Sequence, residues 1–328
     1  MTTEPTPGAH VLSLARQRVA AREQRDWTLA DQLREQIAAA GWLVRDTSDP
    51  EGFELAPRPA FPVAARLDDL PDLRAPGAPT RRVGVGLLIE GWPADLREAV
   101  EALMVHAPSD LVVVGLDAGD VDGAGQVLHE LAGAHPGRVE EWHVAGTVAQ
   151  GAGWGQARNA LLALDPSRVH VVMETSTVLD GDAITPLLAA MDDPTSAAAS
   201  GRTVVGAGWR GVDVDLSDRW RRFVDAGPGE VDALLGYLAA FDAAAVRAVA
   251  GFASAARFYR NADIEMSLAL RAAGGTLVVP AEELPVHQAR HRGYHDSDPE
   301  VRERESRRTY GRILASFRGH PEILAPRP

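Results

Sequence analysis

Short apolar runs alternate with longer amphipathic stretches through the middle of the chain. A continuous apolar run is typical of a buried strand, and apolar positions that recur every three to four residues are typical of a helix. This alternation predicts one α/β domain over residues 81–295, with a mixed, mostly parallel sheet covered by helices on both faces. The strands are expected at about 83–89, 111–116, 139–144, 169–173 and 277–279, and the helices at about 93–105, 123–133, 154–164, 183–191 and 264–273.

Residues 1–57 have a different pattern, which predicts a small unit of helices and a hairpin. Asp26 can cap a helix and Gly41 can end it, and apolar residues recur at helical spacing between them. The apolar segments 42–44 and 53–55 flank a polar turn, and this arrangement predicts a hairpin.

Two further segments complete the organisation of the chain. Residues 58–80 are rich in proline, so a linker with little regular structure is expected there. Residues 296–328 are expected to form a C-terminal helix and tail. The charged helix at 301–317 carries one apolar stripe, which includes Tyr310 and Ile313 and is expected to pack on the domain.

Composition narrows the classes of function. The formal net charge of −13 disfavours nucleic acid as the main partner, because phosphate contacts need clustered cations. All 33 basic residues are Arg, which excludes chemistry that depends on Lys, and Cys is absent, which excludes disulfides and thiolate metal sites. The sequence contains no apolar run long enough for a membrane span and its first residues do not resemble a signal peptide, so a soluble cytoplasmic protein is expected.

Polar residues follow three of the predicted buried strands. Glu90 lies in the loop after the first strand, Asp117 follows the second, and Glu174 with Ser176 follows the strand at 169–173. Ligands of parallel α/β sheets bind at the carboxyl ends of the strands, so these residues are candidates for a nucleotide pocket. The alternative is that they are solvated loop residues.

A Gly-rich segment, 151–155, opens the predicted helix that carries Arg158 and Asn159. Backbone N–H groups at such a helix start favour an anion such as a diphosphate. A simple turn before the helix is the alternative.

A second helix start carries Asp263 and Glu265. Carboxylates there are stabilised by the helix dipole, so both can be caps. A functional alternative is a general base that deprotonates a hydroxyl nucleophile. The preceding loop contains Tyr259 and Asn261, which are suited to holding a sugar.

Three histidines, His287, His291 and His295, are spaced four residues apart. One of them is a candidate metal ligand or phosphate contact, and an ordinary surface loop is the alternative.

In their order along the chain, these segments resemble the family 2 glycosyltransferases over about residues 83–295. The resemblance rests on the strand and loop at 85–91, on Asp117, on the Ala-Arg-Asn element at 157–159, on the strand-end triplet at 174–176, on the Gly-Tyr-Leu segment at 236–238, on the acceptor-like region 251–274 and on His287.

The resemblance implies a GT-A (Rossmann-like) fold that transfers a sugar from a nucleotide-diphosphate sugar to an acceptor hydroxyl with inversion. It also implies that Asp263 is the catalytic base, and that Glu174 and His287 are ligands of a divalent metal, Mg or Mn. The donor-binding residues that it implies are Glu90, Asp117, Arg158, Asn159, Glu174 and Ser176, and the acceptor-binding residues are Gly236, Tyr259, Asn261 and Glu265.

Two positions depart from the family's pattern. The triplet Glu174-Thr175-Ser176 replaces an Asp-x-Asp metal motif, and Ser176 is a weak ligand for a hard cation. Ala262 replaces the Glu of a Glu-Asp element, although Asp263 keeps the position of the base. A catalytically degenerate protein that binds a nucleotide sugar or a partner is therefore an alternative.

The N-terminal unit has a resemblance of its own. Residues 21–34, 41–46 and 52–53 resemble the C-terminal segment of cysteinyl-tRNA synthetases, and because the catalytic part is absent, aminoacylation is not implied. Residues 1–57 contain six basic and nine acidic residues, a net charge of −3 that does not favour a phosphate backbone. The unit is expected to dock a protein partner, with a tRNA-related accessory role as the alternative.

Overall fold

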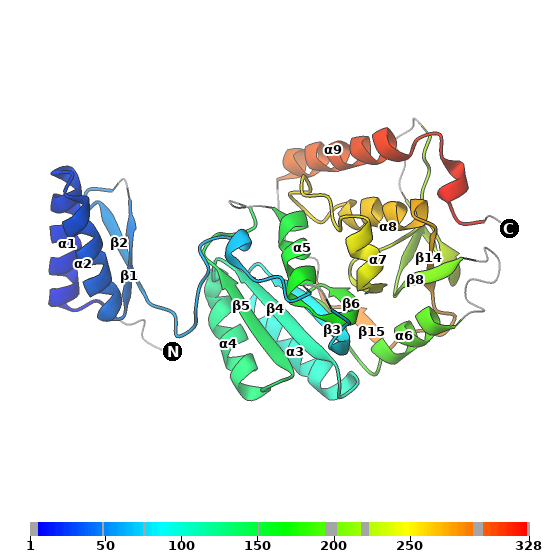
Figure 1. Ribbon diagram of the computed structural model, residues 1–328, viewed down its shortest axis with the longest axis horizontal. Helices are drawn as coiled ribbons and strands as arrows, with labels where there is room; N and C mark the ends of the chain where they lie inside the picture. The colour runs from blue at the N-terminus through cyan, green and yellow to red at the C-terminus, as the bar shows by residue number, and fades with distance from the viewer. Residues whose placement is uncertain are drawn as a thin grey trace. The chain divides into compact units, whose positions relative to one another are not determined.

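The chain forms two compact units, residues 1–61 and 62–328 (Figure 1). The computed structural model describes residues 6–47, 49–74, 77–149, 151, 153–193, 202–217, 223–290 and 298–326.

Unit 1 consists of two helices and a hairpin. They are α1 (Ala9–Glu23), α2 (Trp27–Ala39), β1 (Trp42–Asp46) and β2 (Phe53–Pro57). The Asp26 side chain accepts a hydrogen bond of 3.0 Å from the Leu29 N–H, so the predicted cap of α2 is confirmed. The apolar faces of both helices and of the hairpin share one core, which includes Ile37 and Phe53. Arg18, which is buried beneath them, is held by Asp46 at 2.6 Å.

Unit 2 is built on an eight-stranded sheet in the order β11-β14-β8-β13-β6-β3-β4-β5. Its strands are β3 (Arg81–Ile89), β4 (Val112–Ala118), β5 (Val139–Val144), β6 (Ser167–Met173), β8 (Thr203–Gly208), β11 (Gly229–Val231), β13 (Leu238–Asp242) and β14 (Gly275–Val279). The pairs β3–β4, β3–β6, β4–β5 and β8–β14 are parallel, whereas β13 is antiparallel to both of its neighbours. The carboxyl ends of β3, β4, β5, β6, β8 and β14 therefore lie along one edge of the sheet.

Helices cover both faces of this sheet, as the apolar periodicity predicts (Figure 1). One face is packed by α3 (Pro93–His106), α4 (Ala124–Ala134) and α6 (Ile184–Asp192), and the other by α5 (Trp154–Leu164), α7 (Ala243–Ala248) and α8 (Ala262–Ala272). The residues between, such as Val85 and Leu161, have no exposed surface, so the core consists of two apolar layers separated by the sheet.

The proline-rich segment between the two units is more ordered than the sequence predicts. It contains a short 3₁₀ helix, η1 (Leu67–Asp69), and Ala64 forms a parallel bridge with Val144 at the end of β5. Leu67 and Leu70 pack against the core on the α5 face, and Arg74 donates a 2.7 Å hydrogen bond to the Leu162 carbonyl. The segment therefore belongs to unit 2 from residue 62 onward.

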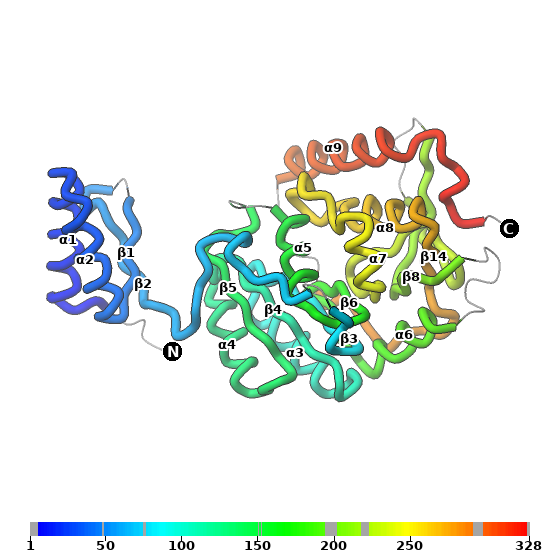
Figure 2. The backbone as a smooth tube through the Cα atoms, in the orientation of Figure 1, coloured from blue at the N-terminus to red at the C-terminus, as the bar shows by residue number. Residues whose placement is uncertain are grey.

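Short strands and a long helix complete unit 2. The strands β9 (Gly211–Asp213), β10 (Val224–Ala226) and β12 (Ala233–Leu234) form one small sheet, and β7 (Thr177–Leu179) pairs with β15 (Val286–Gln288). The helix α9 (Pro299–Phe317) lies along α8, as Figure 2 shows, and a final 3₁₀ turn, η5 (Pro321–Ile323), follows it. Tyr310 and Ile313 are buried there, so the predicted apolar stripe is confirmed.

None of the helices in the described ranges is long and apolar enough to cross a membrane.

Candidate functional site

A group of buried and half-buried charged side chains lies where the neighbouring strands β3 and β6 end. Glu90 follows β3 and Glu174 follows β6, and these strands are parallel neighbours, so both carboxylates reach the same edge. Arg158, on the first turns of α5, is 2% exposed and donates hydrogen bonds to the carbonyls of Gly86 (2.8 Å) and Met173 (3.1 Å). The Ala-Arg-Asn element therefore joins β3 to β6 through the Arg158 side chain.

Burial perturbs all three charged groups. It raises the pKa of Glu90 and of Glu174 to about 7 each, although the Arg158 guanidinium opposes both shifts. It lowers the pKa of Arg158 to about 10 against the opposing pull of the two carboxylates. Glu90 and Glu174 therefore change their protonation state near neutral pH, which is typical of groups in a functional site.

Asp263 joins this group from α8. The side chain is 7% exposed and accepts a 3.0 Å hydrogen bond from the Gly236 N–H. It also accepts one of 2.9 Å from the Ile264 N–H, in the first turn of the helix. Burial raises the pKa of Asp263 to about 6, against the effect of these N–H donors, so the carboxyl is largely ionised at pH 7. A buried carboxylate of this kind is suited to accepting a proton.

Two tyrosines and a glutamine surround the carboxylates. Burial and the charges of Glu174 and Asp263 raise the pKa of Tyr237 to about 12, and they raise that of Tyr259 as well. Gln288, on β15, donates a 3.1 Å hydrogen bond to Glu174, and its Oε1 atom is buried without a partner among the described residues. The phenols therefore stay protonated at neutral pH.

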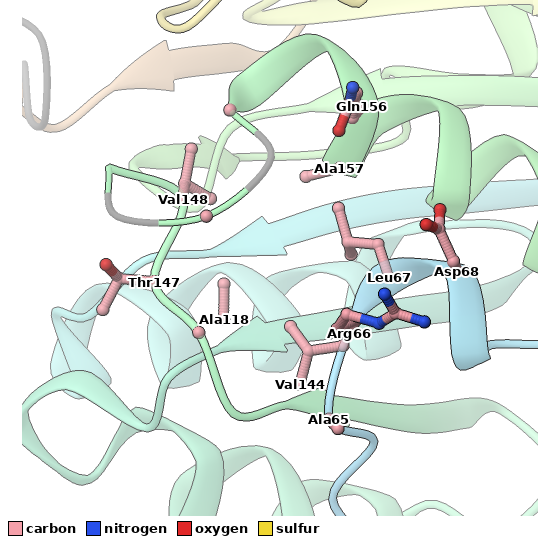
Figure 3. Close-up of a pocket in the computed structure, with 13 residues that line it drawn as sticks. Ala65, Arg66, Leu67, Asp68, Ala118, Val144, Thr147, Val148, Gln156 and Ala157 are labelled. Carbon is pink, nitrogen blue, oxygen red and sulfur yellow. The ribbon is translucent and has the colours of Figure 1, made fainter.

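A cavity opens at the ends of β4 and β5 (Figure 3). It has a volume of about 290 Å³, near the lower end of the range of roughly 300–1,000 Å³ that is usual for ligand pockets. Its walls come from the segment 65–68, from 146–148, 151 and 153 with the first turn of α5, and from Ala118 and Val144. Apolar side chains predominate, and Arg66, Asp68, Thr147 and Gln156 supply polar groups around them.

The predicted donor residue Asp117 does not line this cavity. It is 1% exposed and faces α4, where its Oδ2 lies 3.1 Å from the His143 Nδ1 and its Oδ1 accepts a hydrogen bond from the Asp120 N–H. His143 in turn lies 3.0 Å from Glu141, so a buried carboxylate and histidine chain runs behind the cavity wall. Burial acts to lower the pKa of His143, but the hydrogen bonds with the two carboxylates outweigh burial and raise this pKa.

The predicted donor residue Asn159 holds a loop together. Its side chain both donates to and accepts from the backbone of Phe252, at 2.8 Å in each case. Gly251 has a φ of +70°, and a Cβ at this position would come within 2.3 Å of the Asn159 Oδ1. Asn159 therefore positions the loop before α8 and makes no contact with the cavity described above.

The predicted metal ligands are not brought together. Glu174 is bound to Gln288, whereas His287 is exposed and its Nδ1 lies 2.8 Å from Asp180. The side chains of adjacent strand residues point to opposite faces, which separates His287 from Glu174. Ser176 is buried, and no group of three or more His, Asp or Glu residues in the described part of the chain is arranged to hold a metal ion. His291 and His295 lie outside the described residues.

The predicted acceptor residues are divided between two places. Gly236 and Tyr259 lie beside Asp263 and Glu174. Glu265 instead binds Arg312 of α9 at 2.8 Å, and Asn261, which has a φ of +62°, is buried with its amide 3.5 Å from Ser306. The latter two residues attach α8 to α9.

Several residues of the site are absent from the sequence prediction. Tyr237, in the turn before β13, and Gln288, on β15, are adjacent to predicted positions, and both interact with Glu174. Arg260, whose charge acts on Asp263 and both tyrosines, lies in the loop singled out for sugar contacts. Glu141 and His143 are two residues apart on one strand, so their side chains share a face. This spacing was the feature of the sequence that could have predicted the hydrogen-bonded Asp117, His143 and Glu141.

Comparisons with known proteins agree with the topology. Residues 5–50 match the family model of the cysteinyl-tRNA ligase anticodon binding domain, and no curated protein matches the sequence. A mannosyltransferase from Pyrobaculum calidifontis, solved with GDP-Man and Mn²⁺, is similar with 18% identity and a TM-score of 0.54, over 78% of this chain and 73% of that chain.

A second solved structure, GalNAc-T7 with UDP, GalNAc and Mn²⁺, is similar with 14% identity and a TM-score of 0.53. The likeness covers 70% of this chain and 48% of the other, so the chain spans about half the length of that protein. At these identities the likeness concerns the fold. Together with the mostly parallel eight-stranded sheet and its two helical layers, it shows that the chain contains a GT-A glycosyltransferase fold.

Proposed function

We propose that the protein is an inverting glycosyltransferase that transfers a sugar from a nucleotide-diphosphate sugar to an acceptor hydroxyl. The observation that carries this proposal is Asp263, a buried carboxylate with a pKa of about 6 that is held by the Gly236 N–H at the carboxyl edge of a GT-A sheet. The cavity at the ends of β4 and β5, on the same edge of the sheet, is the position proposed for the nucleotide.

The chemistry follows from the charges of the group. Asp263 takes the proton of the acceptor hydroxyl while the hydroxyl oxygen forms a bond to the anomeric carbon of the donor. The bond from that carbon to the diphosphate oxygen breaks on the opposite side, which inverts the configuration. Tyr237 and Tyr259, whose pKa values are raised, keep their O–H groups at neutral pH. Gln288 has a buried Oε1 without a partner among the described residues, so a hydroxyl group of the sugar would find an acceptor there.

The leaving diphosphate requires positive charge. Because Glu174, Ser176 and His287 are not assembled as ligands, we propose no step through a metal ion. Arg260 lies near Asp263 and is the side chain that we propose for this role. A cationic side chain aimed at charge that develops in the transition state is an established way to stabilise it.

The test is to replace Asp263 with Asn. Titration calorimetry with UDP- and GDP-sugars, each with and without Mn²⁺, identifies the donor, and mass spectrometry of the products measures transfer. The variant is expected to lose transfer by roughly 10²–10⁴-fold, the usual contribution of a general base, while donor binding is kept. The exposed Asp31, replaced in the same way, is the control.

Full transfer by the Asp263 variant would contradict the assignment of the base. If the protein bound no nucleotide at all, the whole proposal would be refuted.

Glu174 and His287 are not brought together to bind a cation, and this favours a second candidate function. In this alternative the protein is catalytically degenerate and binds a nucleotide sugar without transferring it. Tight donor binding without hydrolysis or transfer over hours would support this candidate over the first.

For the N-terminal unit we propose a docking role with a protein partner. Its match to an anticodon binding domain makes tRNA the alternative ligand, whereas its net charge of −3 does not favour a phosphate backbone. A gel shift with tRNA that persists at physiological salt would contradict the docking proposal.

A further inference from the structure

A second cavity lies on the same sheet edge, on the side away from the first. It has a volume of about 360 Å³ and is lined by 209–211 after β8, by 225–228 around β10, and by 279–284 after β14. Because β8 and β14 run in the same direction as β6, these segments emerge at the edge where Glu174 lies. The first cavity lies at the β4–β5 end of this edge and the second at the β8–β14 end.

Backbone hydrogen bonds connect the second cavity directly to the proposed base. The Leu235 N–H donates to the Arg210 carbonyl at 2.9 Å, and the next residue, Gly236, donates its N–H to Asp263. The Arg210 guanidinium also interacts with Tyr237, the residue after Gly236, because its positive charge opposes the rise in the pKa of Tyr237. Arg210, which lines the cavity, is therefore bonded to Leu235, and the neighbouring Gly236 holds the proposed base Asp263.

The opposite wall leads to the other carboxylate. The segment 279–284 continues into β15, whose Gln288 donates a hydrogen bond to Glu174. The segment 279–284 is therefore joined, through β15, to the residue that holds Glu174.

The lining of the cavity combines acceptors, a donor and an aromatic ring. Asp225, Glu282 and Glu283 are exposed carboxylates in it, and Arg210 is the cation among its lining residues. The Arg210 guanidinium lies over the ring of Trp209, 4.3 Å from the centroid, and Trp209 is packed against the core of the domain. The cation–π contact fixes the direction of the donor group.

We propose that this second cavity binds the acceptor, and that the acceptor is an uncharged, hydroxyl-rich molecule such as a saccharide. The proposal rests on the function proposed above. Hydroxyl groups donate to the carboxylates, which only accept, and accept from the guanidinium of Arg210, which only donates.

The charge of the cavity disfavours anionic acceptors. Three carboxylates against one guanidinium give the lining a net charge of −2. An acceptor that carries a carboxylate or a phosphate is repelled by this lining, and like charges placed close together are costly to binding.

Saturation-transfer NMR with sugars of known charge tests the proposal. The full-length protein is titrated with methyl α-glucoside and methyl α-mannoside, and with glucuronate and glucose 6-phosphate as anionic counterparts, with and without the nucleotide identified by calorimetry. A neutral glycoside is expected to bind at least about tenfold more tightly than the anionic sugars, a difference that corresponds to about 1.4 kcal/mol.

Two variants on exposed side chains locate the site without disturbing the core. Arg210→Gln and the double change Glu282→Gln with Glu283→Gln are each expected to weaken neutral-sugar binding by about tenfold, because each removes charge-assisted hydrogen bonds. Exposed Glu101 of α3, replaced by Gln, is the matched control and is expected to bind sugar as the unchanged protein does.

Preference for the anionic sugars, unchanged affinity in both variants, or absence of neutral-sugar binding in a protein that binds its nucleotide would each overturn the proposal. Nucleotide binding, measured on the same samples, tests the proposed glycosyltransferase function separately. If the neutral sugar bound through these residues but no nucleotide bound, the saccharide site would stand and the glycosyltransferase assignment would be refuted.

Discussion

Replacing Glu90 with Gln is expected to stabilise the fold at alkaline pH and to change it little at acid pH. Burial raises the pKa of Glu90 from 4.5 to about 7. A carboxyl whose pKa is higher in the folded state is easier to protonate there than in the unfolded chain. The folded protein therefore loses stability as the pH rises from about 4.5 to about 7, and Gln cannot ionise, so it avoids this loss.

The size of the effect follows from the shift in pKa. A difference of about 2.5 units at about 1.36 kcal/mol per unit corresponds to about 3 kcal/mol at pH 8, where the penalty is fully present. At pH 5 the same two pKa values leave less than about 1 kcal/mol. The free energy of unfolding of the variant, relative to that of the unchanged protein, is therefore expected to be about 2–3 kcal/mol more favourable at pH 8 than at pH 5.

Urea unfolding at the two pH values, followed by Trp fluorescence, measures this difference. Glu101→Gln, at an exposed position on α3, is the control and is expected to show no gain that depends on pH. If Glu90→Gln destabilised the protein equally at pH 5 and pH 8, the carboxylate would be stabilised in the folded state and the reasoning about its burial would be wrong. Loss of donor binding in the same variant would indicate that the destabilised carboxylate is kept for function.

Two other expectations follow from buried carboxylates. The kcat/KM for transfer is expected to fall below pH about 6, because Asp263 must be ionised to accept a proton, and a flat profile between pH 5 and pH 8 would contradict its role as the base. Asp165→Asn is expected to cost about 3–5 kcal/mol in urea unfolding, because Asp165 lies 2.7 Å from His170 and both are buried. Asp192→Asn, which breaks an exposed pair with Arg168, is expected to cost at most about 1 kcal/mol, and equal losses in the two variants would refute the argument from burial.

The sequence predicts the first half of the sheet well because its strands are buried on both faces. Such strands are continuous apolar runs, and β5 and α5 have the bounds that the pattern indicates. The second half follows a different rule. β13 is antiparallel to both neighbours, and its apolar residues alone do not reveal its direction. The three-residue strands β7 and β15 are too short to produce a period.

The sequence predicts where the residues of the candidate site lie along the strands and helices, but it does not predict which partners their side chains contact. Asp263 and Glu174 are found where the strand and helix ends place them, and Arg158 lies between the two central strands. Asp117 faces α4 because alternate residues of β4 point to opposite faces, and its partner His143 comes from the neighbouring strand. Which long-range partner a buried polar side chain finds depends on strand order, and strand order is a property of the whole sheet.

The order of the segment at 62–74 has a consequence for how the protein can be divided. Its residues 65–68 form one wall of the first cavity, and Arg74 is anchored to the Leu162 carbonyl of α5. A fragment that starts at the first long strand, near residue 81, would contain every strand of the large sheet and would still lack a wall of that cavity. The unit that contains the large sheet and both cavities therefore begins at residue 62, and exchange of the N-terminal unit for another would have to preserve the chain from that residue onward.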